Sequence, residues 1–141
     1  MKDNHPPGLF KKFWVQVDRS IAAGHLRSPE EVLKELERGT DDLGPLLKAK
    51  AGLFVPLDAT LQAAVEEVNT ACTDLSDYDN DRDVADPFVV ALARLLTGTV
   101  VTDERPRRSP DARRKIPDAC ADLGVPCCKW FEFLAEIGWD L

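Results

Sequence analysis

The sequence has no long hydrophobic run, no excess of positive charge and no paired cysteine motif. Its 141 residues contain no apolar stretch near the ~20 residues that cross a bilayer. The first eight residues also lack the apolar segment of a secretory signal. We therefore expect a soluble, cytoplasmic protein without a membrane partner. Because the net charge is −7, a polyanion would have to bind locally and not through the overall charge.

Cysteine and histidine chemistry has little support either. The chain has two histidines and four cysteines, none of them in a Cys-x-x-Cys pair. A structural zinc site is therefore not expected. We expect reduced thiols that pack as small hydrophobic side chains. The sequence holds no glycine-rich phosphate loop, no His-Glu-x-x-His and no Gly-x-Ser-x-Gly. A mechanism with a nucleophile and a histidine base thus has little to work with.

Length and patterning predict a single domain over residues 1–141 in which helices and short strands alternate. Such alternation indicates an α/β fold with helices covering a parallel sheet. Strands are predicted at 53–57, 99–102 and 125–128, and helices at 9–24, 28–38, 41–50, 58–75, 86–98, 116–123 and 130–137.

Local signals set several of these helix starts. Ser28 is predicted to cap the second helix, with Pro29 at its first helical position and Glu31 completing a capping box. Asp58 is predicted to cap the fourth helix. The helix that opens at Asp86 is apolar almost all round, so we expect it to be buried on most sides.

Four acidic residues stand where predicted elements begin or end: Glu35, Asp86, Asp103 and Glu104. Ligands of parallel sheets bind beyond the carboxyl ends of the strands, and Asp103 and Glu104 directly follow such an end. Glu35 borders the apolar face of its helix. Several carboxylates brought together are costly unless a cation joins them, and an oxygen-only ligand set favours Mg²⁺ or Mn²⁺.

Each acid also has a plain structural interpretation. Asp86 before Pro87 is a common N-cap, Glu35 a half-exposed helix residue, and Asp103 and Glu104 ordinary loop acids. Only their joint placement favours a functional site.

A basic segment follows the predicted strand end. This concentration of charge suits a phosphate backbone, although a solvated loop or an acidic protein partner would explain it as well. Its candidate nucleic-acid-binding residues are Arg105, Arg107, Arg108, Arg113, Arg114 and Lys115.

In three segments, 28–35, 85–93 and 100–104, the sequence resembles the PIN-domain family of metal-dependent nucleases, many of which are toxins of toxin–antitoxin pairs. The segment 115–125 resembles a PIN-like branch. The resemblance implies a three-layer α/β/α PIN-like sandwich around a short parallel sheet. It also implies an Mg²⁺- or Mn²⁺-dependent ribonuclease that hydrolyses RNA phosphodiester bonds, with an antitoxin protein and a homodimer as further partners.

Carried over by position, the family's second acid falls on Glu35 and its third on Asp86. The strand-end pattern of a threonine and an acid falls on Thr102 and Glu104, with Asp103 as a neighbouring candidate. The resemblance thus implies catalytic roles for these five residues and metal ligation by the four acids.

The sequence departs from the family at its start. PIN domains open with an apolar strand ending in Asp, the first metal ligand, whereas nothing apolar precedes Leu9 and no strand precedes Asp3. The resemblance therefore implies that this strand and ligand are missing, as in a shortened version of a longer protein, and that this chain could be inactive. A degenerate PIN-like module that binds RNA or a protein partner stays open, as does an unrelated interaction protein.

Overall fold

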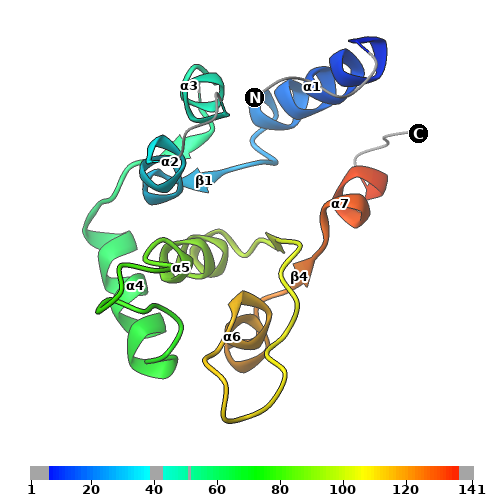
Figure 1. The fold of residues 1–141 in the computed structure, drawn as a ribbon. Coiled ribbons are helices and arrows are strands. Elements are labelled where there is room, and N and C mark those ends of the chain that lie inside the picture. Colours follow the sequence, from blue (N-terminus) through cyan, green and yellow to red (C-terminus); the bar gives the residue numbers. More distant parts are fainter. Residues whose placement is uncertain (1–6, 39–42, 51, 137–141) are drawn as a thin grey trace. The chain divides into compact units, whose positions relative to one another are not determined.

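The computed structural model describes residues 7–38, 43–50 and 52–136, and shows a mixed α/β chain in which short strands alternate with helices (Figure 1). Its elements are α1 (Pro7–Ala22), β1 (Ser28–Pro29), α2 (Glu30–Glu37), α3 (Leu43–Lys48), β2 (Phe54–Val55), α4 (Ala59–Ala71), α5 (Asp86–Leu96), β3 (Val100–Val101), α6 (Ile116–Leu123), β4 (Cys127–Cys128) and α7 (Trp130–Glu136). None of these helices combines the length and the apolar character needed to cross a membrane.

The backbone groups into two compact units. The first contains the described residues up to Pro56 and the end of α7, and the second spans Leu57–Phe133. Each unit holds one parallel two-stranded sheet: β1 pairs with β2, and β3 pairs with β4. Parallel pairing of short strands joined through helices confirms the predicted α/β class. The single domain over residues 1–141 stays a prediction, because the division into two units does not decide whether they fold as one domain.

In the first unit, a small core forms where α1 meets the segment before β2. Val17, Ile21 and Leu53 are buried together, and Trp14 packs against them with Lys50 lying 4.9 Å from its ring centroid. Gly24 ends the turn after α1 with a φ of 80°, a conformation that glycine adopts without strain. The predicted helix end near Gly24 is therefore confirmed.

The predicted start of the second helix is wrong. Ser28 and Pro29 form strand β1, in which the Ser28 N–H donates to the Leu53 carbonyl at 2.9 Å. Pro29 occupies the cap position, and no side chain accepts a hydrogen bond there. Pairing with β2 draws these two residues into an extended conformation, which moves the helix start to Glu30. Glu31 instead lies 3.7 Å from Lys34 in an ion pair.

The second unit is built around α4 and α5, which lie side by side (Figure 1). Leu61, Val65 and Val68 of α4 are buried, as are Val90 and Ala91 of α5. As predicted, Asp58 caps α4: its Oδ1 accepts a hydrogen bond from the Leu61 N–H at 2.8 Å. The predicted helix stripe extends too far, since α4 ends at Ala71, although Cys72 and Leu75 are still fully buried.

α5 differs from its prediction in two respects. Only one face is buried, while Leu95 and Leu96 are 42% and 57% exposed. Its end is formed by Thr97 with a φ of 53°, and the Gly98 N–H donates to the Ala93 carbonyl. A β-branched residue in the left-handed region is uncommon, so the sequence pattern favoured Gly98 for this role.

We predict that Asp58→Ala lowers the free energy of unfolding by about 1 kcal/mol, because it removes the side-chain acceptor at the start of α4. Urea denaturation followed by circular dichroism measures this loss. Asp58→Asn keeps an acceptor oxygen and serves as the matched control, and we expect it to lose a few tenths of a kcal/mol at most. Equal losses for the two variants would contradict the capping role.

Candidate functional site

The carboxyl end of β3 is extended by Thr102. Its N–H donates to the Cys128 carbonyl at 2.9 Å, which continues the pairing with β4 by one residue. Its Oγ1 accepts a hydrogen bond from the Glu104 N–H at 3.1 Å and closes a tight turn. Thr102 thus fixes the direction in which the next two residues, both acidic, leave the sheet.

Those two acids each hold the first amide of a helix. Glu104 Oε1 accepts from the Ile116 N–H at 2.9 Å, at the start of α6, and Asp103 Oδ1 accepts from the Trp130 N–H at 3.2 Å, at the start of α7. A helix N-terminus favours negative charge through its unpaired N–H groups. The two bonds orient both carboxylates and leave the second oxygen of each, Glu104 Oε2 and Asp103 Oδ2, outside these bonds.

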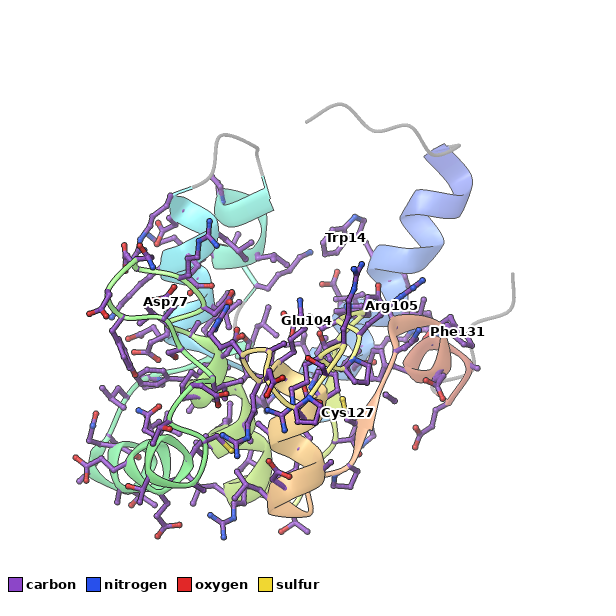
Figure 2. The ribbon with its side chains drawn as sticks, turned by 60° about the horizontal axis from the view of Figure 1, so that its bottom comes forward. Trp14, Asp77, Glu104, Arg105, Cys127 and Phe131 are labelled. Carbon is purple, nitrogen blue, oxygen red and sulfur yellow. The ribbon has the colours of Figure 1, made fainter. Side chains whose placement is uncertain are left out.

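The pKa values of the two adjoining thiols, Cys120 and Cys127, are raised. Burial raises the pKa of Cys120 to about 12. Burial also raises the pKa of Cys127, against a hydrogen bond from Cys120 that lowers it, with the charges of Glu104 and Glu132 adding to the rise. Cys72 and Cys120 are buried, which confirms the predicted packing role for these two. Cys127, labelled in Figure 2, is exposed instead.

Asp86 is the first residue of α5, and its N–H donates to the Asp83 carbonyl at 3.1 Å. The alternative interpretation of Asp86 as an N-cap is wrong, since Ala85 occupies the cap position. Asp86 is half-buried, and its charge helps to raise the pKa of Arg113 after the larger effect of a hydrogen bond to Asp83. It lies in the same unit as Asp103 and Glu104.

Glu35 lies on α2 in the first unit and is half-buried, as its place at the margin of an apolar face predicts. The predicted acid set is therefore divided between the two units, with Asp86, Asp103 and Glu104 in the second.

The carboxylate oxygens of these acids are the right type of ligand for a magnesium or manganese ion, but too few of them lie together in the residues that the structure describes. Carboxylate oxygens are the ligands that Mg²⁺ and Mn²⁺ prefer, and hydrogen-bonded carboxylates are typical of metal sites. Over the described ranges, however, no three acidic, histidine or cysteine side chains lie close enough to hold one ion. The described part of the second unit thus offers oriented oxygens without a closed set of ligands.

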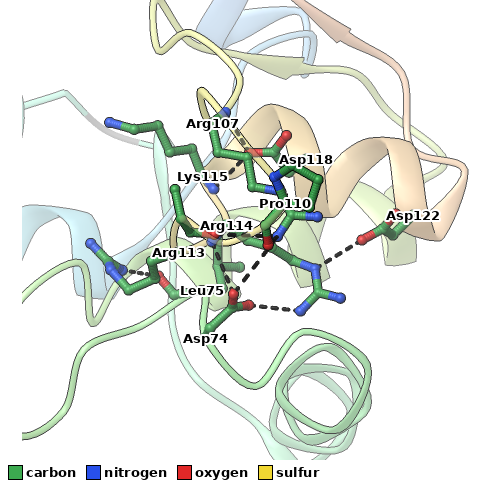
Figure 3. Close-up of polar contacts among 10 residues, drawn as sticks. Asp74, Leu75, Arg107, Pro110, Arg113, Arg114, Lys115, Asp118 and Asp122 are labelled. Carbon is green, nitrogen blue, oxygen red and sulfur yellow. Dashed lines mark hydrogen bonds and ion pairs between the residues drawn. The ribbon is translucent and has the colours of Figure 1, made fainter.

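Three of the six predicted nucleic-acid-binding residues form hydrogen bonds within the second unit (Figure 3). Arg107 donates its N–H to Asp118 and its guanidinium to the Pro110 and Ala112 carbonyls. Arg113 donates to the Leu75 carbonyl and to Asp83. Arg114 binds two acids, Asp74 at 2.7 Å and Asp122 at 2.9 Å.

These bonds tie the segment between β3 and α6 to the end of α4. Burial opposes ionisation of Asp74, but the hydrogen bonds from Arg114 outweigh it and hold the pKa of that carboxyl below its ordinary value of 3.8. The same pairing, first with Asp74 and then with Asp122, raises the pKa of Arg114. Asp83 lies 30 residues from Arg113 and Asp74 lies 40 residues from Arg114 in the sequence, so no local pattern could have identified these two partners.

The other three basic candidates are exposed: Arg105, Arg108 and Lys115. Within the described residues, none of their side chains forms an ion pair. Lys115 contributes its backbone N–H to Asp118 at 2.9 Å, a bond that the helix-start position of Asp118 could have predicted. These three cations are available to an anionic ligand.

The described part of the chain is thus a mixed α/β protein with a polar strand end rimmed by helix N-termini. The whole chain, residues 1–141, matches the family described as "Domain of unknown function (DUF4411)", and it belongs to this family. No curated protein and no solved structure gives a significant match to the chain.

We predict that Asp74→Asn lowers the free energy of unfolding at pH 7, because it removes the charge paired with Arg114. A carboxyl whose pKa is lowered by folding stabilises above its ordinary value of 3.8, and that contribution disappears as the pH falls through the folded pKa. The difference in the free energy of unfolding between wild type and variant should therefore decrease below pH 3.8. Urea unfolding at a series of pH values measures it.

Asp79→Asn is the matched control, since Asp79 is an exposed acid outside these bonds. Its stability should follow that of the wild type at every pH. A loss of unfolding free energy for Asp74→Asn that stays constant from neutral to acidic pH would contradict the ion pair between Asp74 and Arg114.

Proposed function

We propose that this chain is a PIN-like ribonuclease that depends on Mg²⁺ or Mn²⁺ and hydrolyses RNA phosphodiester bonds. The observation that carries the proposal is the pair of strand-end carboxylates, each held through one oxygen by a helix amide. Such bonds position a carboxylate without using both of its oxygens. The nuclease resemblance at residues 28–35, 85–93 and 100–104 supports the same function.

The order of the elements supports the finer fold proposal, a three-layer α/β/α sandwich of the PIN type. Each short strand is followed by a helix, and both strand pairs are parallel. Parallel sheets occur almost only with helices covering both faces, since their connections are helical crossovers. In a sandwich of this kind, polar residues after the strands converge at one rim.

Within this proposal the acids and the cations have separate roles. Asp86, Asp103 and Glu104 of the second unit would hold the ion, and Thr102 would position Glu104 through its backbone bond. A bound Mg²⁺ or Mn²⁺ ion supplies an activated water and neutralises charge on the phosphate. Arg105, Arg108 and Lys115 would bind the RNA backbone, because no ion pair within the described residues engages them.

The proposed partners follow from the same resemblance. We include an antitoxin protein, a second copy of the chain in a homodimer, and a cytoplasmic location, as for toxin nucleases. The net charge of −7 leaves RNA binding to local cations.

A binding module without catalysis is the second candidate, and a specific observation favours it. Asp103 and Glu104 both have structural roles as acceptors for helix amides. The described residues also form no group of three metal-binding side chains. Such a module would hold RNA through its exposed cations while its acids served the fold.

The proposal predicts RNA cleavage that requires Mg²⁺ or Mn²⁺ and stops with EDTA. Asp86→Asn and Glu104→Gln should each reduce the cleavage rate at least about 100-fold, since each removes a negative charge from the ion. Gln keeps an oxygen that can accept from the Ile116 N–H, so Glu104→Gln should leave the thermal unfolding temperature nearly unchanged. A labelled single-stranded RNA resolved on a denaturing gel measures cleavage.

Asp79→Asn, at an exposed acid, is the control and should cleave like the wild type. RNA that binds without being cleaved, with no effect of Asp86→Asn, would favour the binding module. Absence of both binding and cleavage would contradict both functions.

A further inference from the structure

Two large aromatic side chains at the start of α7 face solvent. Phe131 is 67% exposed and Trp130 is 37% exposed. The Trp130 ring packs edge-on against Phe133, with ring centroids 5.7 Å apart at an interplanar angle of 83°, and Phe133 is buried. The packing of Trp130 thus holds one ring against the protein, while the neighbouring Phe131 projects from the first turn.

These aromatic residues are tied directly to the polar strand end. The Trp130 N–H donates to Asp103 Oδ1 at 3.2 Å. Cys128, two residues before Trp130, accepts a hydrogen bond from the Thr102 N–H. Trp130 and Phe131 therefore directly follow a segment that is hydrogen-bonded to the end of β3. Figure 2 labels Phe131 together with Glu104 and Arg105, which come from the acidic strand end.

Two positively charged residues adjoin these hydrogen-bonded residues in the sequence. Arg105 follows Asp103 by two residues, and Lys129 directly precedes Trp130; both are exposed. In the described part of the chain neither side chain forms an ion pair, although the Lys129 backbone N–H donates to Glu132 at 2.9 Å. An exposed aromatic pair, adjoined in the sequence by cations that form no ion pair within the described residues, is complementary to a ligand that combines flat rings with negative charge.

We propose that Trp130 and Phe131 form a base-stacking subsite for single-stranded RNA, with Arg105 and Lys129 binding the adjoining phosphates. This subsite rests on the proposed RNA-binding function. Bases of a single strand are free to stack on aromatic rings, whereas bases of a duplex are already stacked. Stacking on an exposed ring is tolerant of base identity, so the subsite selects strandedness and not sequence.

The test measures binding of fluorescein-labelled 12-nucleotide RNAs by anisotropy in EDTA, where no cleavage is expected. Three probes are compared: oligouridylate, an abasic strand of the same length, and a blunt duplex. Base–aromatic stacking contributes about 1–3 kcal/mol per base, so Phe131→Leu should weaken oligouridylate binding at least about fivefold. The same variant should leave the abasic strand and the duplex unchanged.

Tyr78→Leu is the matched control, because Tyr78 is 57% exposed in the same unit but belongs to the turn after α4. It should bind all three probes like the wild type. Arg105→Gln should weaken the abasic strand and oligouridylate alike, since phosphate contacts do not depend on bases. Circular dichroism checks that each variant is folded.

Three outcomes would overturn the subsite. If Arg105→Gln weakens oligouridylate binding while Phe131→Leu does not, RNA binding stands and stacking fails. If Phe131→Leu changes only the sedimentation coefficient of the free protein, the aromatic pair covers another protein surface. If the wild type binds none of the probes at low salt, the proposed RNA-binding function fails together with the subsite.

Discussion

The hydrogen bonds from two helix amides to the acids after β3 determine much of the second unit. Glu104 receives the first N–H of α6, and Asp103 receives the first N–H of α7. Each helix begins with N–H groups that have no partner within the helix, and a carboxylate satisfies them better than water does. These two hydrogen bonds therefore fix the strand end, the helix starts and the direction of the two acids together.

The arginines after this strand end divide according to their acidic partners. Arg113 and Arg114 reach back to Asp83 and Asp74, which fastens a long connection to the end of α4. Such partly exposed pairs are worth little one by one, but a network with backbone acceptors specifies where the connection lies. The exposed Arg105 and Arg108 remain for a ligand because the network does not use them.

The elements predicted well are those whose signals are local. α6 was predicted to the residue, since Pro117 marks its first turn and Gly124 its end. The Asp58 cap was predicted for the same reason. Ser28 was not, because its conformation depends on pairing with residues some 25 positions away, and a capping motif carries no information about that partner. The sequence placed Asp103 and Glu104 at a strand end, but their amide donors could not be foreseen.

A structural role and a functional role for these acids are compatible in physical terms. A carboxylate that accepts one amide N–H keeps the lone pairs of its other oxygen, and Mg²⁺ commonly takes a single oxygen from each of one or two carboxylates. Truncation of either acid would remove a helix-amide acceptor and, under the proposed function, a metal ligand at once, so loss of activity would not separate the two roles. Amide isosteres do, because they keep the acceptor and remove the charge. The helix starts thus provide the orientation that the proposed metal ligation requires, and the same bonds fix the acids at this strand end.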